Sequence, residues 1–320
     1  MIGGQHMLKP NYYSITELED LKDFFTVSFV IIDDIYQAII PEEIQKRKNI
    51  NQAILSDSEI ITIALVGELL TIDSENAWFK FVKKNFKSLF PRLCDRSRFN
   101  RTRRNLHSVI GEIRKYLCHF FKSEQPDYRI IDSMPIPVCK FGRAHFHKTF
   151  KFQASYGYCP SKKETYYGFK LHVLTTFEGY ITDFVLTKAS IDDREAIWDL
   201  TSEYANGLTI IGDKGYINKE LNPALKKERN IDLIFMQRNK CKTPYPKPFR
   251  QMIFKIRRRI ETSFSQLTEQ LNIAKVKAKS LMGMIARLNT KILAYNLCFY
   301  MNQCLGKDSD VSQIKQLIFG

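Results

Sequence analysis

The sequence lacks a long uncharged apolar run. Its best candidate, Ile60 to Leu70, is interrupted by Gly67 and Glu68 and is shorter than the roughly 18 residues that a membrane-spanning helix needs. The N-terminus also lacks a basic segment followed by an apolar stretch, which is the pattern of an export signal. We therefore expect no membrane association and a cytoplasmic location, and we interpret residues 1–7 as an added leader before a start at Met7.

The sequence also lacks a CxxC pair, although it contains seven cysteines. An odd number of cysteines in a chain without an export signal indicates reduced thiols rather than a disulfide framework. One segment combines metal-binding residue types, Cys139, His145, His147 and Cys159, but their spacings of six, two and twelve residues fit no standard zinc pattern. We interpret this segment as a polar connector and keep a zinc-stabilised binding module as an alternative.

Acidic residues are scarce relative to basic ones. The 34 Asp and Glu residues are outnumbered by 49 Lys and Arg residues, which gives a formal net charge of +15 and a pI near 9.4. This excess favours a polyanionic partner, with nucleic acid ahead of anionic lipid. Because 44% of the 320 residues are hydrophobic, the chain can bury the core of one large or two ordinary domains, and the composition excludes disordered, collagen-like and disulfide-rich classes.

The basic residues are concentrated in two blocks. Residues 91–150 contain thirteen Lys or Arg against five Asp or Glu, and residues 238–280 contain twelve against two. Local excesses of this size are typical of surfaces that bind phosphates, although a merely solvated basic face gives the same pattern. In the first block, the stretch DRSRFNRTRRN places cations that include Arg101 and Arg104 on one helix face and Phe99 on another. It predicts either a helix that contacts the DNA backbone or a solvated helix end.

Residues 1–125 are predicted to form a helical, DNA-binding domain. Ser56 and Glu59 have the spacing of a capping box, and the apolar residues from Trp78 to Phe120 recur at three- and four-residue steps. Residues 276–320 are predicted to form a C-terminal helical extension around an apolar helix at 284–303.

In residues 126–275 the spacing of apolar residues changes from a purely helical pattern to alternating strand and helix patterns, which predicts an α/β domain. Strands are expected at 128–138, 166–177, 180–187, 208–212 and 231–236, and helices after Asp192-Asp193, at 218–229 and at 251–272. Asp192 and Asp193 are interpreted as the N-cap and first-turn charges of their helix. Pro244, Pro246 and Pro248 predict a stiff linker.

Three acidic residues take notable positions in this order of elements. Asp132 lies inside the first strand, Asp213 follows the fourth strand, and Glu261 lies within the helix after the last strand. A carboxylate in an apolar strand is costly unless it is paired, hydrogen-bonded or bound to a cation, and ligand sites form at the strand ends of α/β sheets. If the three converge, they build a site for hard divalent cations.

Each acid also has a structural interpretation when it is taken alone. Asp132 fits a turn or cap before Pro135, Asp213 the start of a turn, and Glu261 a surface partner of Arg257 or Arg258 at helical spacing. Arg257 shares a face with Glu261, so it is expected to hold either that carboxylate or a phosphate.

These residues stand in segments that resemble the bacterial insertion-sequence transposases of the DDE type. The resemblance rests on IIDSMPIPV around Asp132, on YYGFKLHVLTT with FVLTKASIDDREA, on TIIGDKGY around Asp213, and on FKIRRRIETSFSQL around Glu261. It covers about residues 128–300. It implies a ribonuclease-H-like fold, with a mixed sheet flanked by helices, joined to an all-α N-terminal domain and a C-terminal helical extension.

The resemblance implies the following chemistry. Asp132, Asp213 and Glu261 would hold two Mg²⁺ or Mn²⁺ ions for phosphoryl transfer. The enzyme would cleave insertion-sequence ends and join the freed 3′-hydroxyl to target DNA. Its partners would be double-stranded DNA, at the terminal inverted repeats and at the target, and a second copy of the chain, in the bacterial nucleoid. The expected DNA-binding cations are Lys214, Lys255, Arg257, Arg258, Lys275, Arg143, Lys148, Arg101 and Arg104.

The sequence departs from the family pattern on the last catalytic helix. Many relatives carry Tyr-x2-Arg-x3-Glu-x6-Lys, whereas here Phe254 replaces the Tyr and Thr268 replaces the Lys. Two alternatives therefore stay open, a nuclease of the same fold that does not join strands and a non-catalytic DNA-binding relative.

A further cluster of residues near the second strand combines aromatic rings with cations. Tyr166 and Tyr167 accompany Lys162, Lys163, Arg143 and Lys148. This combination suits frayed DNA, through stacking and phosphate contacts, although ordinary strand packing by the two tyrosines is favoured.

Overall fold

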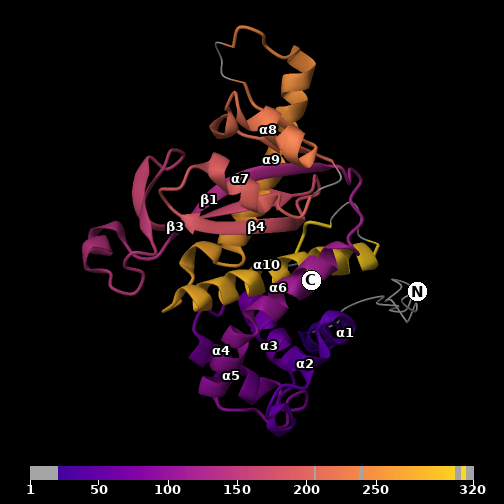
Figure 1. Cartoon of the computed structure of the whole chain (residues 1–320). Coiled ribbons are helices and arrows are strands. Elements are labelled where there is room, and N and C mark those ends of the chain that lie inside the picture. The colour runs from indigo at the N-terminus through magenta and orange to yellow at the C-terminus, as the bar shows by residue number, and fades with distance from the viewer. Residues whose placement is uncertain (1–20, 205–206, 238–240, 307–310, 315–320) are drawn as a thin grey trace. The chain divides into compact units, whose positions relative to one another are not determined.

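The computed structural model divides the chain into two compact units (Figure 1). One consists of Met1–Phe121 with Ala286–Gly320 and the other of Lys122–Ile285; they are called unit 1 and unit 2 below. The residues that the structure describes are 21–204, 207–237, 241–306 and 311–314. The leader expected at residues 1–7 lies outside them. The described residues of 21–121 and of 286–314, which the sequence assigns to two separate segments, belong to the same unit.

Unit 1 is helical throughout its described part, which confirms the all-α class expected for the N-terminal segment. Its helices are α1 (Leu21–Ile39), α2 (Glu42–Gln45), α3 (Asp57–Leu69), α4 (Glu75–Asn85), α5 (Arg96–Asn105), α6 (His107–Cys118) and most of α10 (Leu281–Cys304). The predicted capping box begins α3. The Ser56 hydroxyl accepts a hydrogen bond from the Glu59 backbone N–H at 3.1 Å, and the Glu59 carboxylate accepts one from the Ser56 N–H at 2.6 Å.

The apolar helix α3 is buried on nearly all sides. Gly67 allows the Trp78 indole to lie against it, because a Cβ at Gly67 would come within 2.5 Å of Trp78 Nε1. The same Nε1 donates to the Ile63 carbonyl at 2.9 Å. Glu68 is 4% exposed and is held by Arg287 and Lys291 of α10. The two residues that interrupt this apolar run are therefore packing positions inside a helical unit.

Unit 2 contains a six-stranded mixed sheet, which confirms the α/β fold (Figure 1). Its strands are β1 (Tyr128–Pro137), β2 (Ser155–Cys159), β3 (Glu164–Thr175), β4 (Ile181–Lys188), β5 (Leu208–Gly212) and β6 (Ile231–Phe235). The order is β2-β3-β1-β5-β6, and β4 also pairs with β3. Three antiparallel pairs, β1–β3, β2–β3 and β3–β4, are followed by two parallel pairs, β1–β5 and β5–β6.

Strand β2 was not expected from the sequence. It pairs with residues 164–168 of β3, whereas β4 pairs with residues 169–175. The turn between β3 and β4 falls at the predicted Glu178-Gly179, where Gly179 has a φ of +100° that favours glycine. The sheet is thus extended by a short edge strand. Its five residues, with a glycine at the centre, are too few to show a strand pattern in the sequence.

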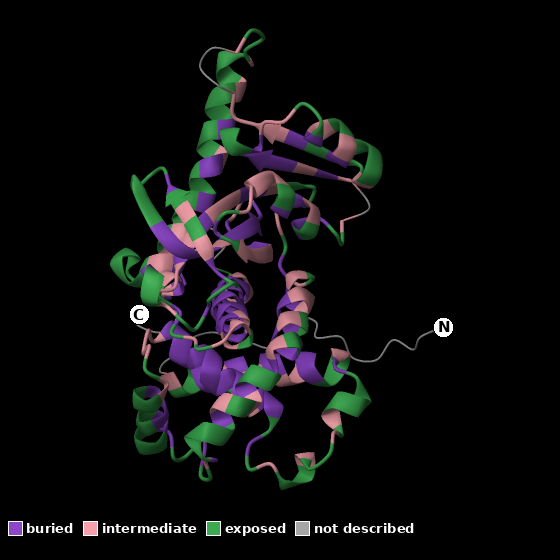
Figure 2. Ribbon diagram, turned by 60° about the vertical axis from the view of Figure 1, so that its left-hand side comes forward, coloured by how far each residue is buried: buried purple, intermediate pink, exposed green. Residues whose placement is uncertain are grey.

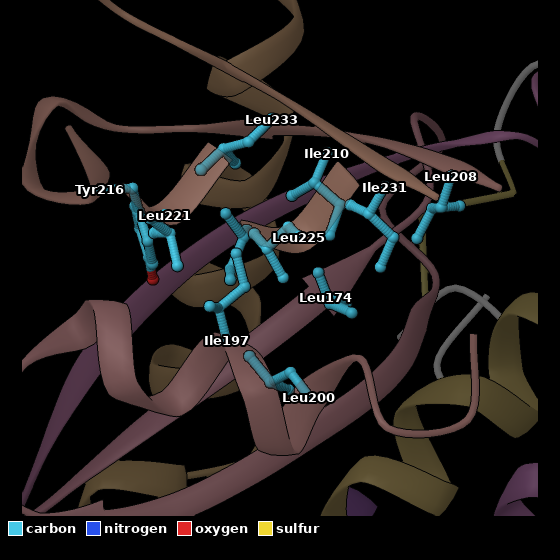
Figure 3. Packing of buried hydrophobic residues seen from close by; sticks show 11 residues of the cluster. Leu174, Ile197, Leu200, Leu208, Ile210, Tyr216, Leu221, Leu225, Ile231 and Leu233 are labelled. Carbon is cyan, nitrogen blue, oxygen red and sulfur yellow. The ribbon is translucent and has the colours of Figure 1, made fainter. Parts of the chain in front are cut away.

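The core of unit 2 lies between the sheet and two helices, α7 (Asp193–Leu200) and α8 (Leu221–Arg229). Figure 3 shows this cluster, in which Ile197 and Leu200 of α7 and Leu225 of α8 meet the strand residues. Ile131 of β1 belongs to it. Because side chains alternate along a strand, Asp132 points to the opposite face of the sheet.

Helix α9 (Lys247–Glu269) packs against β1 and β5. It begins four residues before the predicted start, since Pro246 is its N-cap and Pro248 lies in its first turn, where the missing N–H is not needed. The prediction of a linker through Pro248 was therefore wrong at its end. The buried stripe of α9 contains Arg257 as well as Ile253 and Ile260.

Burial follows the layers of each unit. Figure 2 shows buried residues on the strands and inner helices and exposed residues on outer helices and loops. Among the residues that the structure describes, no helix is both long and apolar enough to cross a bilayer.

Candidate active site

Asp132 and Asp213 come together because neighbouring strands carry them. Strands β1 and β5 are parallel, and Ile130 is in register with Ile211. Asp132 and Asp213 each lie two residues further along, so they occupy equivalent places at the same edge of the two strands. Asp132 lies within β1 and Asp213 directly follows β5, so the parallel pairing brings an acid inside one strand beside an acid at the end of the next.

One guanidinium joins the two carboxylates. Arg257 Nη2 lies 3.0 Å from Asp132 Oδ2, and Arg257 Nη1 lies 3.2 Å from Asp213 Oδ1. The Arg257 side chain is only 10% exposed, whereas that of Asp213 is 45% exposed. Arg257 Nη1 also lies 3.1 Å from Met236 Sδ. Arg257 therefore balances the charge of both aspartates from the buried face of α9.

Asp132 is the more deeply placed of the two acids. Burial raises its pKa to about 6, against the lowering effects of the Arg257 charge and of the hydrogen bond from the Ser133 backbone N–H. The neighbouring carboxylates of Asp213 and Asp193 raise it as well. A carboxyl pKa that is raised by burial and by neighbouring carboxylates marks Asp132 as a candidate functional residue.

Glu261 is not gathered with the two aspartates. It is exposed on α9, one helical turn after Arg257, and lines a shallow hollow with Arg258 and Thr262. Among the described residues, no group of three or more His, Cys, Asp or Glu is placed to hold a metal ion. The structure thus brings together two of the three predicted acids and leaves the third on the same helix as the arginine that joins them.

The same observation bears on the zinc alternative. Cys159 is buried beside Tyr166 and Ala189, whereas His145 is exposed and His147 stacks on Phe150 with ring centroids 5.8 Å apart. The segment does not assemble a zinc site, so the interpretation as a connector is favoured.

Asp193 is the predicted first-turn acid of α7, and it also makes contacts beside Asp132 that the sequence does not indicate. Its carboxylate accepts hydrogen bonds from Lys170 Nζ at 2.8 Å and from the Ser133 hydroxyl at 3.3 Å. His172 Nδ1 lies 3.7 Å away, and burial lowers the pKa of His172 to about 4, although the Asp193 charge opposes this shift. Ser133 follows Asp132 directly in the sequence, so Asp193 contacts the residue next to Asp132.

The adjacent Asp192 has the role that was predicted for it. Its side chain accepts from the Arg194 N–H at 2.9 Å as the N-cap of α7. Its hydrogen bonds from Arg194 hold its pKa at about 2. Asp192 alone caps α7, so the side chain of Asp193 is not needed for the cap and contacts the sheet. The presence of two adjacent aspartates where one is enough is the sequence feature that could have indicated this second role.

A basic pocket opens beside Asp213. It has a volume of about 370 Å³, and its lining includes Lys214, Lys247 and Arg250 with Phe254. None of the described residues that line it is acidic. The arrangement offers carboxylate oxygens on one side and cations for phosphate groups on the other.

The other predicted DNA-binding cations are exposed, in contrast to Arg257. They are Arg101 and Arg104 of α5, Arg143, Lys148, Lys214, Lys255, Arg258 and Lys275. Arg258 lies over the Phe254 ring at 5.2 Å from its centroid. On α5, however, Arg103 is turned inward and pairs with Glu75 at 3.0 Å.

Comparison with known proteins assigns unit 2 to a family. The family model described as a transposase DDE domain matches residues 122–281, half of the chain. Among solved structures, the cryo-EM structure of the piggyBac transposase synaptic complex with hairpin DNA is similar at a TM-score of 0.49 and 12% identity, covering 95% of this chain and 80% of that chain. No curated protein matches significantly.

Proposed function

This chain belongs to the family of transposase DDE domains, and we propose that it is a metal-dependent DNA transposase that cleaves insertion-sequence ends and joins the 3′-hydroxyl to target DNA. The observation that carries the proposal is the meeting of Asp132 and Asp213 at the guanidinium of Arg257. Two neighbouring strands and a helix that is distant in sequence supply hard oxygen ligands and a phosphate-binding cation at this place.

The donor chemistry of this site fits Mg²⁺ or Mn²⁺. We propose that Asp132, Asp213 and Glu261 hold two such ions, which would activate the attacking hydroxyl and stabilise the leaving oxygen. Because Glu261 is exposed one turn beyond Arg257, its participation requires a local adjustment of α9. Arg257, which balances both aspartates, is suited to hold a non-bridging oxygen of the reacting phosphate.

The charge distribution supports double-stranded DNA as the partner. Lys214, Lys247 and Arg250 line the pocket beside Asp213, so a phosphate backbone there would meet cations on the side away from the carboxylates. On α5 of unit 1, the exposed Arg101 and Arg104 offer a second set of backbone contacts. We propose that the chain acts as a homodimer, since transposition requires two ends to be held together.

The test uses oligonucleotides that carry the DNA flanking the gene, incubated with the purified protein and Mn²⁺ in the presence of a target plasmid. We expect strand cleavage that leaves a 3′-hydroxyl, followed by covalent joining of that end to the plasmid. Cleavage without joining would favour the nuclease alternative, and specific binding without cleavage would favour the non-catalytic one.

Replacing Asp193 with Asn is expected to reduce cleavage by about 10- to 100-fold, which is typical for residues that orient a metal-binding shell. The change weakens the Lys170 contact and removes a negative charge next to Ser133. The concentration of Mn²⁺ needed for half-maximal cleavage should rise, a readout that a purely structural role would leave unchanged.

The matched control is Asp192→Asn. Asn remains a good N-cap, and Asp192 bonds Arg194 rather than the sheet. Cleavage should therefore stay within about twofold of the parent protein. Equal activity and metal dependence in the two variants would show that Asp193 does not serve the site.

A further inference from the structure

Five aromatic side chains stand exposed in one short segment of unit 2. They are Phe141, Phe146, Phe152, Tyr156 and Tyr158, with exposed fractions from 50% to 81%, and together they are called the aromatic patch below. The described part of the chain has twelve exposed large hydrophobic side chains, and five of them fall within these 18 residues. Such a concentration of exposed rings marks an interaction surface.

The patch is built on the unexpected edge strand β2. Tyr156 and Tyr158 alternate with the less exposed Ser155, Gly157 and Cys159, so both tyrosines point to the same face. The ring of Phe141 contacts that of Tyr156 edge-on, with centroids 5.9 Å apart. These three rings therefore form a continuous surface rather than scattered apolar residues.

A buried aromatic ring of β3 packs against the aromatic patch and holds Tyr156 in place. Tyr156 packs on the buried Tyr167 with ring centroids 5.0 Å apart, and Tyr166 is buried as well. The sequence favours strand packing for Tyr166 and Tyr167, and both side chains are buried on β3. The rings available to a ligand are instead those of the preceding segment.

The charge of this segment is entirely positive. No Asp or Glu occurs between Asp132 and Glu164, whereas six Lys or Arg residues do. All six, namely Lys140, Arg143, Lys148, Lys151, Lys162 and Lys163, are exposed. Lys151 Nζ lies 5.2 Å from the centroid of the Phe152 ring. A ligand that offers flat apolar faces and negative charge at short intervals would complement this surface.

We propose that the aromatic patch binds unpaired nucleotides of a DNA strand, with the bases stacked on the rings and the phosphates held by the surrounding lysines. Stacking on aromatic side chains together with cationic backbone contacts is the general mode of single-strand binding. A fully paired duplex covers the faces of its bases with neighbouring bases, so it can use the cations but not the rings. The inference rests on the proposed function, because it names the state of the DNA that the transposase engages.

The distance between the patch and the candidate active site sets the position of these nucleotides. Val138 follows the end of β1 and donates its N–H to the Tyr167 carbonyl, so the patch adjoins that end of the strand. Val138 lies six residue steps along the chain from Asp132, which corresponds to roughly 20 Å of extended strand. At about 3.4 Å per stacked nucleotide, the bound bases would lie on the order of six nucleotides from the reacting phosphate.

The test measures binding by the full-length protein in EDTA, which prevents cleavage. The probes are one duplex with blunt ends and the same duplex with a single-stranded tail of about six nucleotides, labelled in the tail with 2-aminopurine, whose fluorescence is quenched by stacking. We expect the parent protein to bind the tailed duplex roughly tenfold more tightly and to quench the label.

Two double variants separate stacking from folding. Tyr156→Leu with Tyr158→Leu removes the π-faces and should abolish both the tail preference and the quenching, while affinity for the blunt duplex stays within about twofold. Tyr156→Phe with Tyr158→Phe keeps the rings and should retain both. Equal binding of the two duplexes by the parent protein, or quenching that persists in the Leu variant, would overturn the proposal.

Three further outcomes separate the remaining possibilities. If the Leu variant keeps its tail preference and instead changes oligomeric state in analytical ultracentrifugation, the patch is a protein interface and the proposal is wrong. Asp132→Asn, in contrast, should keep the tail preference, because Asp132 lies away from the patch. Failure of the parent protein to cleave DNA with Mn²⁺ would count against the transposase proposal alone, since the binding test contains no metal.

Discussion

Replacing Asp132 with Asn is expected to abolish metal-dependent DNA cleavage and to leave unit 2 folded. The amide has the same shape and can still accept the hydrogen bond from the Ser133 N–H, but it lacks the charge that a divalent cation requires. Electrostatic stabilisation by metal contributes several kcal/mol to such reactions, so the cleavage rate should fall at least about 1000-fold. Asp213→Asn should have the same effect, because Asp213 is the partner acid across β1 and β5.

The stability of Asp132→Asn is expected to equal or exceed that of the parent protein. Burial raises the pKa of Asp132 to about 6, which means that its charge is unfavourable in the folded state and that its removal relieves a cost. The measurements are initial cleavage rates with Mn²⁺ and thermal unfolding of both proteins. Loss of cleavage accompanied by unfolding would indicate a structural role for this carboxylate.

A matched control and a third variant complete the series. Asp199 is exposed on α7, so Asp199→Asn makes the same chemical change in the same unit and should leave the rate within about twofold. Glu261→Gln should also lose at least about 100-fold if α9 adjusts to bring Glu261 to the aspartates. Full activity of Glu261→Gln, together with inactivity of Asp132→Asn, would remove Glu261 from the site.

The sequence predicts Asp132 and Asp213 because local patterns mark both. Once the strands are assigned, Asp132 stands out as an acid inside an apolar strand and Asp213 as an acid at a strand end. The assignment of β5 was correct, since its bounds are the predicted ones. Their convergence then follows from the parallel pairing of β1 and β5. This part of the site depends on elements whose periodicity is readable along the chain.

The contacts of Asp193 and Arg257 depend on tertiary packing, which no local pattern records. Asp193 lies 60 residues from its partner Ser133, and Arg257 lies 125 residues from Asp132. Arg257 lies on the buried face of α9 together with Ile253 and Ile260. Helical periodicity predicts apolar residues on a buried face, so it does not predict an arginine there. The carboxylates of Asp132 and Asp213 that stabilise Arg257 belong to β1 and to the end of β5.

The largest expected loss of stability comes from Glu68 in unit 1. Its carboxylate accepts from Arg287 Nε at 2.9 Å and Nη2 at 3.0 Å, and Lys291 Nζ lies 2.5 Å from it. These three side chains are at most 9% exposed. Glu68→Gln would leave two buried cations without their counter-charge, which typically costs about 3–5 kcal/mol. That is a large fraction of the total stability of an ordinary domain.

The measurement is urea unfolding followed by tryptophan fluorescence. The chain has two tryptophans, Trp78 in unit 1 and Trp198 in unit 2, so a Trp198→Phe background makes the signal report on unit 1 alone. Glu42→Gln is the matched control, because Glu42 forms an exposed ion pair with Lys46 on α2 and such pairs contribute little. An unchanged unfolding midpoint in Glu68→Gln would show that the buried charges are compensated elsewhere.

The pH dependence distinguishes a lost charge from lost packing. Burial alone would raise the pKa of Glu68, but the charges of Lys291 and Arg287 outweigh it and lower the pKa from 4.5 to about 2. Because the folded-state pKa is depressed, the stabilisation is complete above about pH 4.5 and is lost as the pH falls towards 2. The shift corresponds to about 3 kcal/mol. The parent protein should lose this stability between those pH values, and Glu68→Gln, which has no carboxylate to protonate, should lack that part of the slope.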